Sequence, residues 1–263
     1  MKTNKKIGFI LLKSTKLSLT MKKLSKRLEI INSMIDTHYQ NIWDCCCDHG
    51  LLGLTLLKRR TANIIHFVDI VPSLTSRLES LLQQHFVAEG YTQRWKVHCI
   101  DVAKLPLTTN EKHLVIIAGV GGELLIEFME SIVNKYQQNI SVSTINEIEF
   151  ILCPVHYNYQ VRQTLIKHHF ELLDECIVSE NKRFYEVIHV KKTFTNATVK
   201  SEPKDNISPT GSLMWDMTNK FHQQYLEKIL NHYQRALLAG SPNEQVTTSH
   251  IIQQYASLTS KPK

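Results

Sequence analysis

The sequence predicts an α/β protein with a mostly parallel seven-stranded sheet and one antiparallel hairpin at the sheet edge. Three observations support this fold class. Short apolar runs alternate with longer amphipathic segments, two apolar runs follow one another directly near residues 172–190, and several runs end in an acidic or glycine-rich stretch. Alternating strands and helices favour a parallel sheet covered on both faces, whereas two adjacent strands favour a hairpin.

The expected strands are short and largely apolar, as is typical of strands buried on both faces. They cover residues 41–46, 64–69, 95–100, 113–118, 147–153, 172–178 and 184–190. The fourth run is nearly all apolar, the fifth is stopped by Pro154, and the last alternates in part between apolar and polar residues. These runs supply the seven strands.

The expected helices lie between and after these strands. They cover residues 24–35, 51–60, 73–89, 121 or 123 to 136, 157–169, 213–238 and 246–258. In the first, Leu24, Leu28 and Ile31 recur at helical spacing, and Ser25 is placed to start the helix. Ser73 is the expected N-cap of the third, because it follows Pro72 and carries a capping hydroxyl.

The 263 residues, 43% of them hydrophobic, leave room for one large α/β domain and a smaller appendage. We expect a disordered basic leader over residues 1–20, the α/β domain over 21–195, a linker over 196–210 and an α-helical domain over 211–263. The leader holds five lysines and no acid, within a net charge of +7 for the chain. Such a segment attracts phosphate non-specifically, and Met21 is an alternative start of translation.

Composition also excludes some classes of protein. Mean hydropathy is −0.19, and no apolar run approaches the roughly 18 residues that a membrane span needs, so we expect a cytoplasmic protein. Of six cysteines, Cys45, Cys46 and Cys47 are adjacent, which is atypical of a disulfide framework. Only Cys47 and His49 offer ligands at close spacing, and no second pair follows them. We therefore expect no metal site.

Acidic residues end three of the expected strands. Asp44 opens the stretch 44–50, Asp69 ends the second strand, and Asp101 follows the third. Ligands bind at the carboxyl ends of strands in open parallel sheets, where an acid after the second strand accepts the ribose hydroxyls of a nucleoside. Asp101 is then placed to accept a hydrogen bond from an adenine amino group. The alternative is solvated strand ends, with Asp48 capping the next helix; the spacing of Asp69 favours the nucleoside.

The stretch after the fourth strand is rich in glycine. Gly119, Gly121 and Gly122 fall within four residues and permit a ligand to approach the backbone closely. An NAD oxidoreductase would instead carry G-x-G-x-x-G after the first strand, where that pattern is absent. After the fifth strand, His156 and Tyr157 are candidates for a proton relay and for base stacking. The sequence supports equally well the alternative that His156 and Tyr157 are solvated loop residues.

At these residues the chain resembles the bacterial tRNA adenine-22 N1-methyltransferase family (TrmK). The resemblance runs from about residue 24 to 190, with a weaker similarity in the C-terminal helices, and the D-H loop combined with A-G-x-G-G is fairly specific. The matching pieces are Leu24-Ser25-Lys26-Arg27-Leu28 with the family's opening helix, Asp44 and Asp48-His49-Gly50 with D-I-G-S-D-H-[AG], Ile117-Ala118-Gly119-Val120-Gly121-Gly122 with I-A-G-M-G-G, Leu152-Cys153-Pro154 and Arg162 with L-Q-P-N and a downstream arginine, Phe184-Tyr185-Glu186-Val187 with K-x-Y-E-[IV], and Gly211 with residues 221–230 at the start of the C-terminal helical hairpin.

The resemblance implies a class I Rossmann-like domain that binds S-adenosyl-L-methionine, and methylation of adenine N1 in the D-arm of tRNA. The implied cofactor site comprises Asp44, Cys46, Asp48, His49, Gly50, Asp69, Ile70, Asp101, Val102, Ala118, Gly119, Val120 and Gly121. The candidate catalytic residues are Asp48, Pro154, His156 and Tyr157. Because adenine N1 carries a lone pair, positioning and desolvation would supply most of the rate, and Asp48 is expected to stabilise the charged product.

Two departures from the family's pattern affect the implied function. Cys45-Cys46 replaces the family's I-G, so the glycine beside the cofactor is missing, and Cys153 and Val155 replace the glutamine and asparagine that face the target base. Val155 cannot hydrogen-bond an adenine edge, so the cofactor is implied more strongly than the target. The alternatives are a methyltransferase for another RNA, a protein or a small molecule, and a non-catalytic RNA-binding protein with the same fold.

A tRNA partner requires a path for its phosphates. The expected RNA contacts are Lys26, Arg27, Arg59, Arg60 and Arg162, with Lys22, Lys23 and Lys58 beside them. Basic side chains of this kind are more often a solvated surface, so the salt dependence of binding decides between the two. We expect a monomer or a weak dimer.

Overall fold

The structure is a computed structural model that describes residues 23–86, 93–140, 146–194 and 206–259. The predicted basic leader and most of the predicted linker lie outside these residues. The strands are β1 (Tyr39–Cys45), β2 (Ala62–Asp69), β3 (Trp95–Cys99), β4 (His113–Ala118), β5 (Asn146–Cys153), β6 (Glu171–Glu180) and β7 (Arg183–Phe194). The helices are α1 (Lys26–Met34), α2 (Leu51–Arg59), α3 (Pro72–Phe86), α4 (Gly122–Gln138), α5 (Asn158–Lys167), α6 (Lys220–Ala239) and α7 (Pro242–Ala256), with 3₁₀ turns η1 (Val102–Lys104) and η2 (Ser257–Thr259).

All seven strands form one sheet in the order β3-β2-β1-β4-β5-β7-β6. Strands β1 to β5 pair in parallel, whereas β7 pairs antiparallel with both β5 and β6. The turn between β6 and β7 places Asn181 at φ 50° and Lys182 at φ 62°, as a tight hairpin turn requires. The predicted fold class is confirmed: a mostly parallel sheet with one antiparallel edge hairpin.

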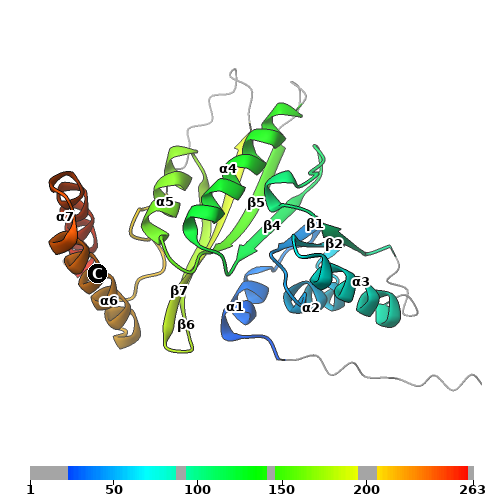
Figure 1. Ribbon diagram of the computed structural model, residues 1–263, viewed down its shortest axis with the longest axis horizontal. Helices are drawn as coiled ribbons and strands as arrows, with labels where there is room; N and C mark the ends of the chain where they lie inside the picture. The colour runs from blue at the N-terminus through cyan, green and yellow to red at the C-terminus, as the bar shows by residue number, and fades with distance from the viewer. Residues whose placement is uncertain (1–22, 87–92, 141–145, 195–205, 260–263) are drawn as a thin grey trace, which may run out of the picture.

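Helices cover both faces of the sheet (Figure 1). On one face α4 and α5 pack on side chains such as Trp43 and Val115. On the other, α1, α2 and α3 pack on their neighbours in the strands, such as Ile42 and Leu114. Because successive strand residues point to opposite faces, each central strand contributes to both cores. This double cover leaves the ends of the strands for a ligand.

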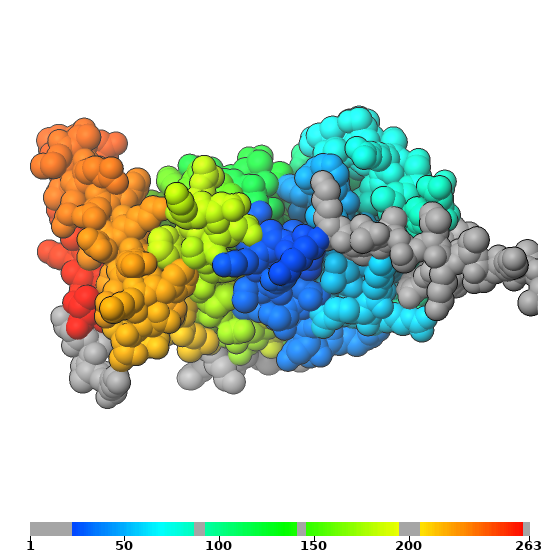
Figure 2. Space-filling model, turned by 90° about the horizontal axis from the view of Figure 1, so that it is seen from below, coloured from blue at the N-terminus to red at the C-terminus, as the bar shows by residue number. Residues whose placement is uncertain are grey.

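The two C-terminal helices form a hairpin beside the sheet, next to the β6–β7 hairpin (Figures 1 and 2). Tyr159 of α5 packs with Leu226 of α6 and Tyr255 of α7 in a small separate core. Phe184 of β7 and Phe221 of α6 also meet, with ring centroids 5.1 Å apart. The helical hairpin is therefore fixed to the sheet through both α5 and β7.

Several helix boundaries differ from the prediction, and α7, for example, begins at Pro242 and not at residue 246. Helix α3 begins at Pro72 rather than after Ser73, since the fixed φ of proline suits the first turn of a helix. Helix α6 begins at Lys220 and not near residue 213, with Asn219 as its N-cap. Residues 212–214 are held outside the helix because the Glu175 carboxylate accepts their backbone N–H groups. No helix among the described ranges has the length and apolar character needed to cross a membrane.

Candidate functional site

The carboxyl ends of β1, β2, β4 and β5 lie at one edge of the sheet. Cys45 pairs with Val68 on one side and with Ile117 on the other, and Ala118 pairs with Cys153. The loops that follow these strands therefore start side by side. The predicted cofactor residues lie at these strand ends, at the adjacent end of β3 and in the loops that follow, so the parallel topology collects them at this edge.

The loop after β1 turns sharply through several left-handed residues. Cys46 has φ 55°, Asp48 has φ 49° and Gly50 has φ 67°, a region that glycine enters freely and other residues enter at a cost. The turn is fixed by a hydrogen bond from Cys47 N to Val68 O of 3.1 Å. Gly50, not Asp48, is the N-cap of α2, so Asp48 does not cap that helix. Its carboxylate instead lies 2.6 Å from His49 Nδ1, and both side chains are exposed.

Asp44 is buried beneath this loop. Its Oδ2 accepts a hydrogen bond from Gly53 N at 2.9 Å. Burial raises the pKa of Asp44 to about 7; the Gly53 N–H opposes this shift and nearby Asp69 adds to it. A Cβ on Gly53 would lie 2.3 Å from the Phe67 ring and 2.9 Å from Asp44 Oδ2. The missing side chain at Gly53 thus lets α2 approach the strands and reach Asp44.

Asp69 and Asp101 accept hydrogen bonds from the backbone of the loops around them. Asp69 accepts hydrogen bonds from Asp48 N at 3.1 Å and from Val71 N at 3.0 Å. Asp101 accepts one from Ala103 N at 3.0 Å and begins η1. Beside Asp69, Ile70 is 67% exposed and offers an apolar surface of the kind that an adenine ring covers.

The three carboxylates act on a common neighbour, Cys46. Burial raises the pKa of the Cys46 thiol to about 11, with further contributions from Asp69, Asp44 and Asp101 in that order. The strand register supports this proximity, because Cys45 pairs with Val68 and Asp69 pairs with Cys99, so that β1, β2 and β3 end side by side. The structure brings together the three acids that the sequence placed at separate strand ends.

The glycine-rich loop after β4 lies against the loop after β5. Gly119 N donates to Cys153 O at 3.1 Å, and Val155 N donates to Val120 O at 2.9 Å. Gly119 has φ 88°, which only glycine adopts without strain. A Cβ on Gly122 would lie 2.6 Å from Tyr157 Cβ, so a larger residue there would force these loops apart.

Of the candidate catalytic residues, His156 and Tyr157 lie at this junction. The His156 ring lies 3.0 Å from the position that a Cβ on Gly121 would take, and its Nδ1 lies 3.4 Å from Glu123 Oε2. Tyr157 is 44% exposed and holds φ 71°. Pro154 is buried. Two exposed polar rings therefore border the glycine loop.

Arg27 is a site residue whose position the sequence did not indicate. It was assigned to RNA, but its Nη2 lies 3.5 Å from the position that a Cβ on Gly119 would take. The guanidinium carbon lies 4.8 Å from the centroid of the Tyr185 ring, and Nε is buried without a hydrogen-bond partner among the described residues. A cation thus points at the glycine loop. The only sequence signal was its place in the matching opening helix, which does not say where the side chain reaches.

One of the predicted RNA contacts is wrong. Arg162 is fully buried, and its guanidinium lies 2.6 Å from Glu175 and 2.7 Å from Glu186. Arg59 is exposed, yet its Nη1 donates to Asn32 O at 2.6 Å and ties α2 to α1. No group of three or more potential ligands for a metal occurs within the described ranges.

The fold and this edge of the sheet define a class of protein. Helices cover both faces of the sheet, its seventh strand is antiparallel, acids lie at the ends of three strands, and glycines follow the fourth. This is the architecture of class I methyltransferases. The chain belongs to the methyltransferase domain family, whose model matches residues 24–188. A comparison with curated protein sequences finds no match.

Solved structures with this fold cover most of the chain. Sp1610 of Streptococcus pneumoniae in complex with S-adenosyl-L-methionine is 20% identical, with a TM-score of 0.62 over 89% of this chain and 99% of that one. M. capricolum TrmK in complex with S-adenosyl-homocysteine is 17% identical, with a TM-score of 0.64 over 90% and 98%. The B. subtilis m1A22 tRNA methyltransferase TrmK is 19% identical, with a TM-score of 0.62 over 89% and 95%. At these identities the likeness establishes the fold.

Proposed function

We propose that the chain is an S-adenosyl-L-methionine-dependent methyltransferase that methylates N1 of an adenine in the D-arm of tRNA, at position 22 by family resemblance. The observation that carries the proposal is that Asp44, Asp69 and Asp101 lie at the adjacent carboxyl ends of β1, β2 and β3, with Arg27 facing the glycine loop. The similar B. subtilis structure is an m1A22 tRNA methyltransferase, which supports the choice of substrate. Such an enzyme works in the cytoplasm on a soluble RNA, as a monomer or a weak dimer.

The residues at the edge fit this cofactor in their chemistry. The guanidinium of Arg27 beside Gly119, and the missing side chain at Gly119, suit the carboxylate of the methionine part. Asp69 would take the ribose hydroxyls, Asp101 the adenine amino group, and Ile70 the face of the adenine ring. The cofactor supplies a methyl group made electrophilic by the positively charged sulfur to which it is bonded.

The remaining work falls to residues that position the acceptor. Adenine N1 has a free lone pair, so the chain needs no strong base before transfer. Methylation leaves the ring positively charged, and the exposed carboxylate of Asp48 is the group that we expect to stabilise that charge. An Asp48→Asn variant should lose turnover while keeping its affinity for S-adenosyl-homocysteine. Unchanged turnover would exclude this role.

The direct test of the activity is incubation with labelled S-adenosyl-L-methionine and unmodified tRNA, followed by nucleoside mapping. We expect label in 1-methyladenosine from the D-arm. Label at another nucleoside would keep the enzyme class and change the target. No transfer to tRNA, protein or metabolite pools, together with no calorimetric signal for S-adenosyl-homocysteine, would leave a non-catalytic RNA-binding protein.

A second target has one specific observation in its favour. Val155 is 39% exposed at the loop that borders the glycines, and its side chain offers no hydrogen bond to an adenine edge. A methyltransferase for another RNA, a protein or a small molecule is the resulting alternative. Transfer to bulk tRNA, compared side by side with transfer to protein and metabolite extracts, separates these substrates.

We also propose that the chain has two folded domains, a Rossmann-like domain over residues 21–195 and a helical domain over 211–263, joined by 196–210. Limited proteolysis should cut first between them. Initial cleavage inside the α/β part would contradict this division.

A further inference from the structure

A cavity of about 680 Å³ lies between the end of the loop after β5, the start of β7 and the two C-terminal helices. Its volume falls within the range of roughly 300 to 1,000 Å³ that is usual for ligand sites. Val155, His156 and Tyr157 border both this cavity and the glycine loop. The cavity therefore adjoins the proposed methyl-transfer site without being part of the cofactor edge.

The lining of this cavity is positively charged. Arg183, Lys228 and Arg235 line it, together with two histidines, and no aspartate or glutamate does. All three cations are exposed, and none forms an ion pair with a carboxylate of the described chain. Figure 2 shows the space-filled β6–β7 hairpin and α6, the elements that carry these cations, side by side on one face of the molecule. Unpaired cations with no competing acid favour an anionic ligand.

The same cavity contains aromatic rings at different depths. Tyr225 is buried and Phe184 stacks on it, with ring centroids 5.1 Å apart. Lys228 Nζ lies 5.5 Å from the centroid of the Phe184 ring. Tyr157 and Tyr233 lie nearer the surface and are not stacked on each other in the structure. Cations interleaved with aromatic rings are the pattern by which proteins hold unstacked bases and their phosphates.

Two residues that line this cavity each have a buried side-chain oxygen without a partner among the described residues: Asn158 Oδ1 and Gln160 Oε1. The orientation of the Asn158 amide follows from its neighbours. Tyr225 Oη donates its proton to Glu186 Oε1 at 2.8 Å, so it can only accept from Asn158, whose Nδ2 lies 3.1 Å away. The carbonyl oxygen of Asn158 is thereby left without a donor. Buried acceptors are expensive to leave unsatisfied, which points to a ligand that donates.

We propose that this cavity binds an unstacked nucleotide of single-stranded RNA next to the methylated base. The phosphates would lie on Arg183, Lys228 and Arg235, and the base on the exposed ring of Tyr157. An exocyclic amino group or a ribose 2′-hydroxyl would donate to Asn158 and Gln160 once these amides turn towards the cavity. This inference rests on the proposed function for the identity of the RNA, but the binding itself does not require catalysis.

The test is fluorescence anisotropy with a labelled seven-nucleotide RNA, and with an abasic chain that carries the same phosphates. The variant R183Q/K228Q/R235Q should bind the RNA at least tenfold more weakly. Its slope of log affinity against log salt should be shallower by about 2, since each phosphate contact on a single strand contributes about 0.7. The matched control R77Q/K96Q/K167Q removes three exposed cations outside the cavity and should bind like the unmodified chain.

The role of the bases has its own measurement. The unmodified chain should prefer RNA to the abasic chain at least fivefold, and Tyr157→Leu should abolish that preference. Equal binding of both probes to the unmodified chain, or full affinity in the triple variant, would overturn the inference. S-adenosyl-homocysteine affinity and methyl transfer to tRNA are measured on the same proteins. If the chain methylates tRNA but the triple variant binds RNA with full affinity, this inference is wrong and the proposed function stands. If RNA binding depends on the cavity but no methyl transfer occurs, the proposed function is wrong and this inference stands.

Discussion

Cys46 combines a side chain with a backbone conformation suited to glycine. A left-handed residue with a Cβ carries a strain of about 1–2 kcal/mol, and Cys46 holds φ 55°. We predict that Cys46→Gly raises the midpoint of thermal unfolding and tightens binding of S-adenosyl-homocysteine, because it removes both the strain and the bulk. Cys46→Ala is the matched control, since it removes the sulfur and keeps the strain. An equal rise in both variants would mean that backbone strain is not the cause.

Asp44 makes the stability of the protein depend on pH. Its pKa is raised from 3.8 to about 7 in the folded chain, so its contribution is fully present below the unfolded pKa and is lost as pH rises through about 7. Asp44→Asn stays neutral. The unfolding free energy of Asp44→Asn, minus that of the wild-type chain, should therefore rise by up to about 1.4 kcal/mol per pH unit between pH 3.8 and about pH 7. Urea unfolding from pH 4 to 8 measures this difference, and Asp36→Asn, at an exposed position, is the matched surface control.

Arg27 gives a prediction about the two parts of the proposed cofactor. Arg27→Gln should weaken S-adenosyl-homocysteine binding at least tenfold, because the cation facing Gly119 is lost. Binding of methylthioadenosine, which lacks the amino acid part, should not change. Isothermal titration with both ligands provides the measurement, and equal losses for both would refute a carboxylate contact.

How far the sequence predicts the site differs from residue to residue. The acids at the ends of β1, β2 and β3 were predictable, because strand ends follow from local hydrophobic pattern and their shared edge follows from parallel topology. The position of Arg27 was not, because a long side chain on a helix reaches across to a loop that is distant in sequence. The prediction that Arg162 contacts RNA was wrong for the same reason. Its charge is visible in the sequence, but its burial depends on contacts with β6 and β7.

At the scale of elements, a buried ion pair ties three of them together. Arg162 of α5 contacts Glu175 of β6 and Glu186 of β7, and Tyr225 of α6 donates to the same Glu186. Burial by itself would raise the pKa of Glu175, but the charge of Arg162 and backbone N–H groups hold that pKa below its usual value. The cluster thus links the loop that bears Tyr157 to the C-terminal helices.

We predict that Arg162→Met lowers the unfolding free energy by about 3–5 kcal/mol, because two buried carboxylates lose their cation. The helical hairpin should also become more sensitive to proteolysis, since Glu186 would no longer hold Tyr225 in one geometry. Lys167→Met, at the exposed end of the same helix, is the control. A loss below about 1 kcal/mol in urea unfolding would contradict the role of the cluster.

The boundaries of the elements were predictable where local chemistry decides them and not where tertiary contacts do. Ser25 caps α1 as expected, accepting a hydrogen bond from Leu28 N at 3.4 Å. The late start of α6 was not predictable, because the acceptor that holds residues 212–214 is Glu175, far away in sequence.

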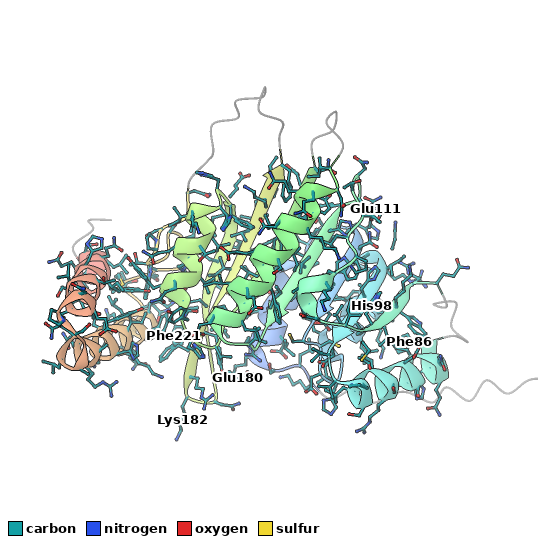
Figure 3. The ribbon with its side chains drawn as sticks, turned by 45° about the horizontal axis from the view of Figure 1, so that its top comes forward. Phe86, His98, Glu111, Glu180, Lys182 and Phe221 are labelled. Atoms are coloured by element: carbon teal, nitrogen blue, oxygen red, sulfur yellow. The ribbon has the colours of Figure 1, made fainter. Side chains whose placement is uncertain are left out.

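Figure 3 places Phe221, near the start of α6, beside the β6–β7 hairpin marked by Glu180 and Lys182. His98 and Glu111 lie at the opposite end of the molecule.

For the whole molecule, charge is unevenly distributed along the chain. Residues 1–20 hold five lysines and no acid, while the chain carries +7 in total. We predict that a chain starting at Met21 binds tRNA more weakly and with a shallower salt dependence, yet keeps its affinity for S-adenosyl-homocysteine and its methylated position. Filter binding over a salt series, with nucleoside mapping, checks both parts. Methylation at a different nucleotide of the tRNA would show that residues 1–20 take part in recognising the target.

The raised pKa of the Cys46 thiol matters for an enzyme whose proposed cosubstrate is an alkylating agent. An ionised sulfur is a strong nucleophile towards such reagents, whereas the protonated form is a poor one. With a pKa of about 11 for Cys46, about one thiol in ten thousand is ionised at pH 7. Burial of Cys46, with a further contribution from the acids expected to bind the nucleoside, therefore protects the protein from methylating itself.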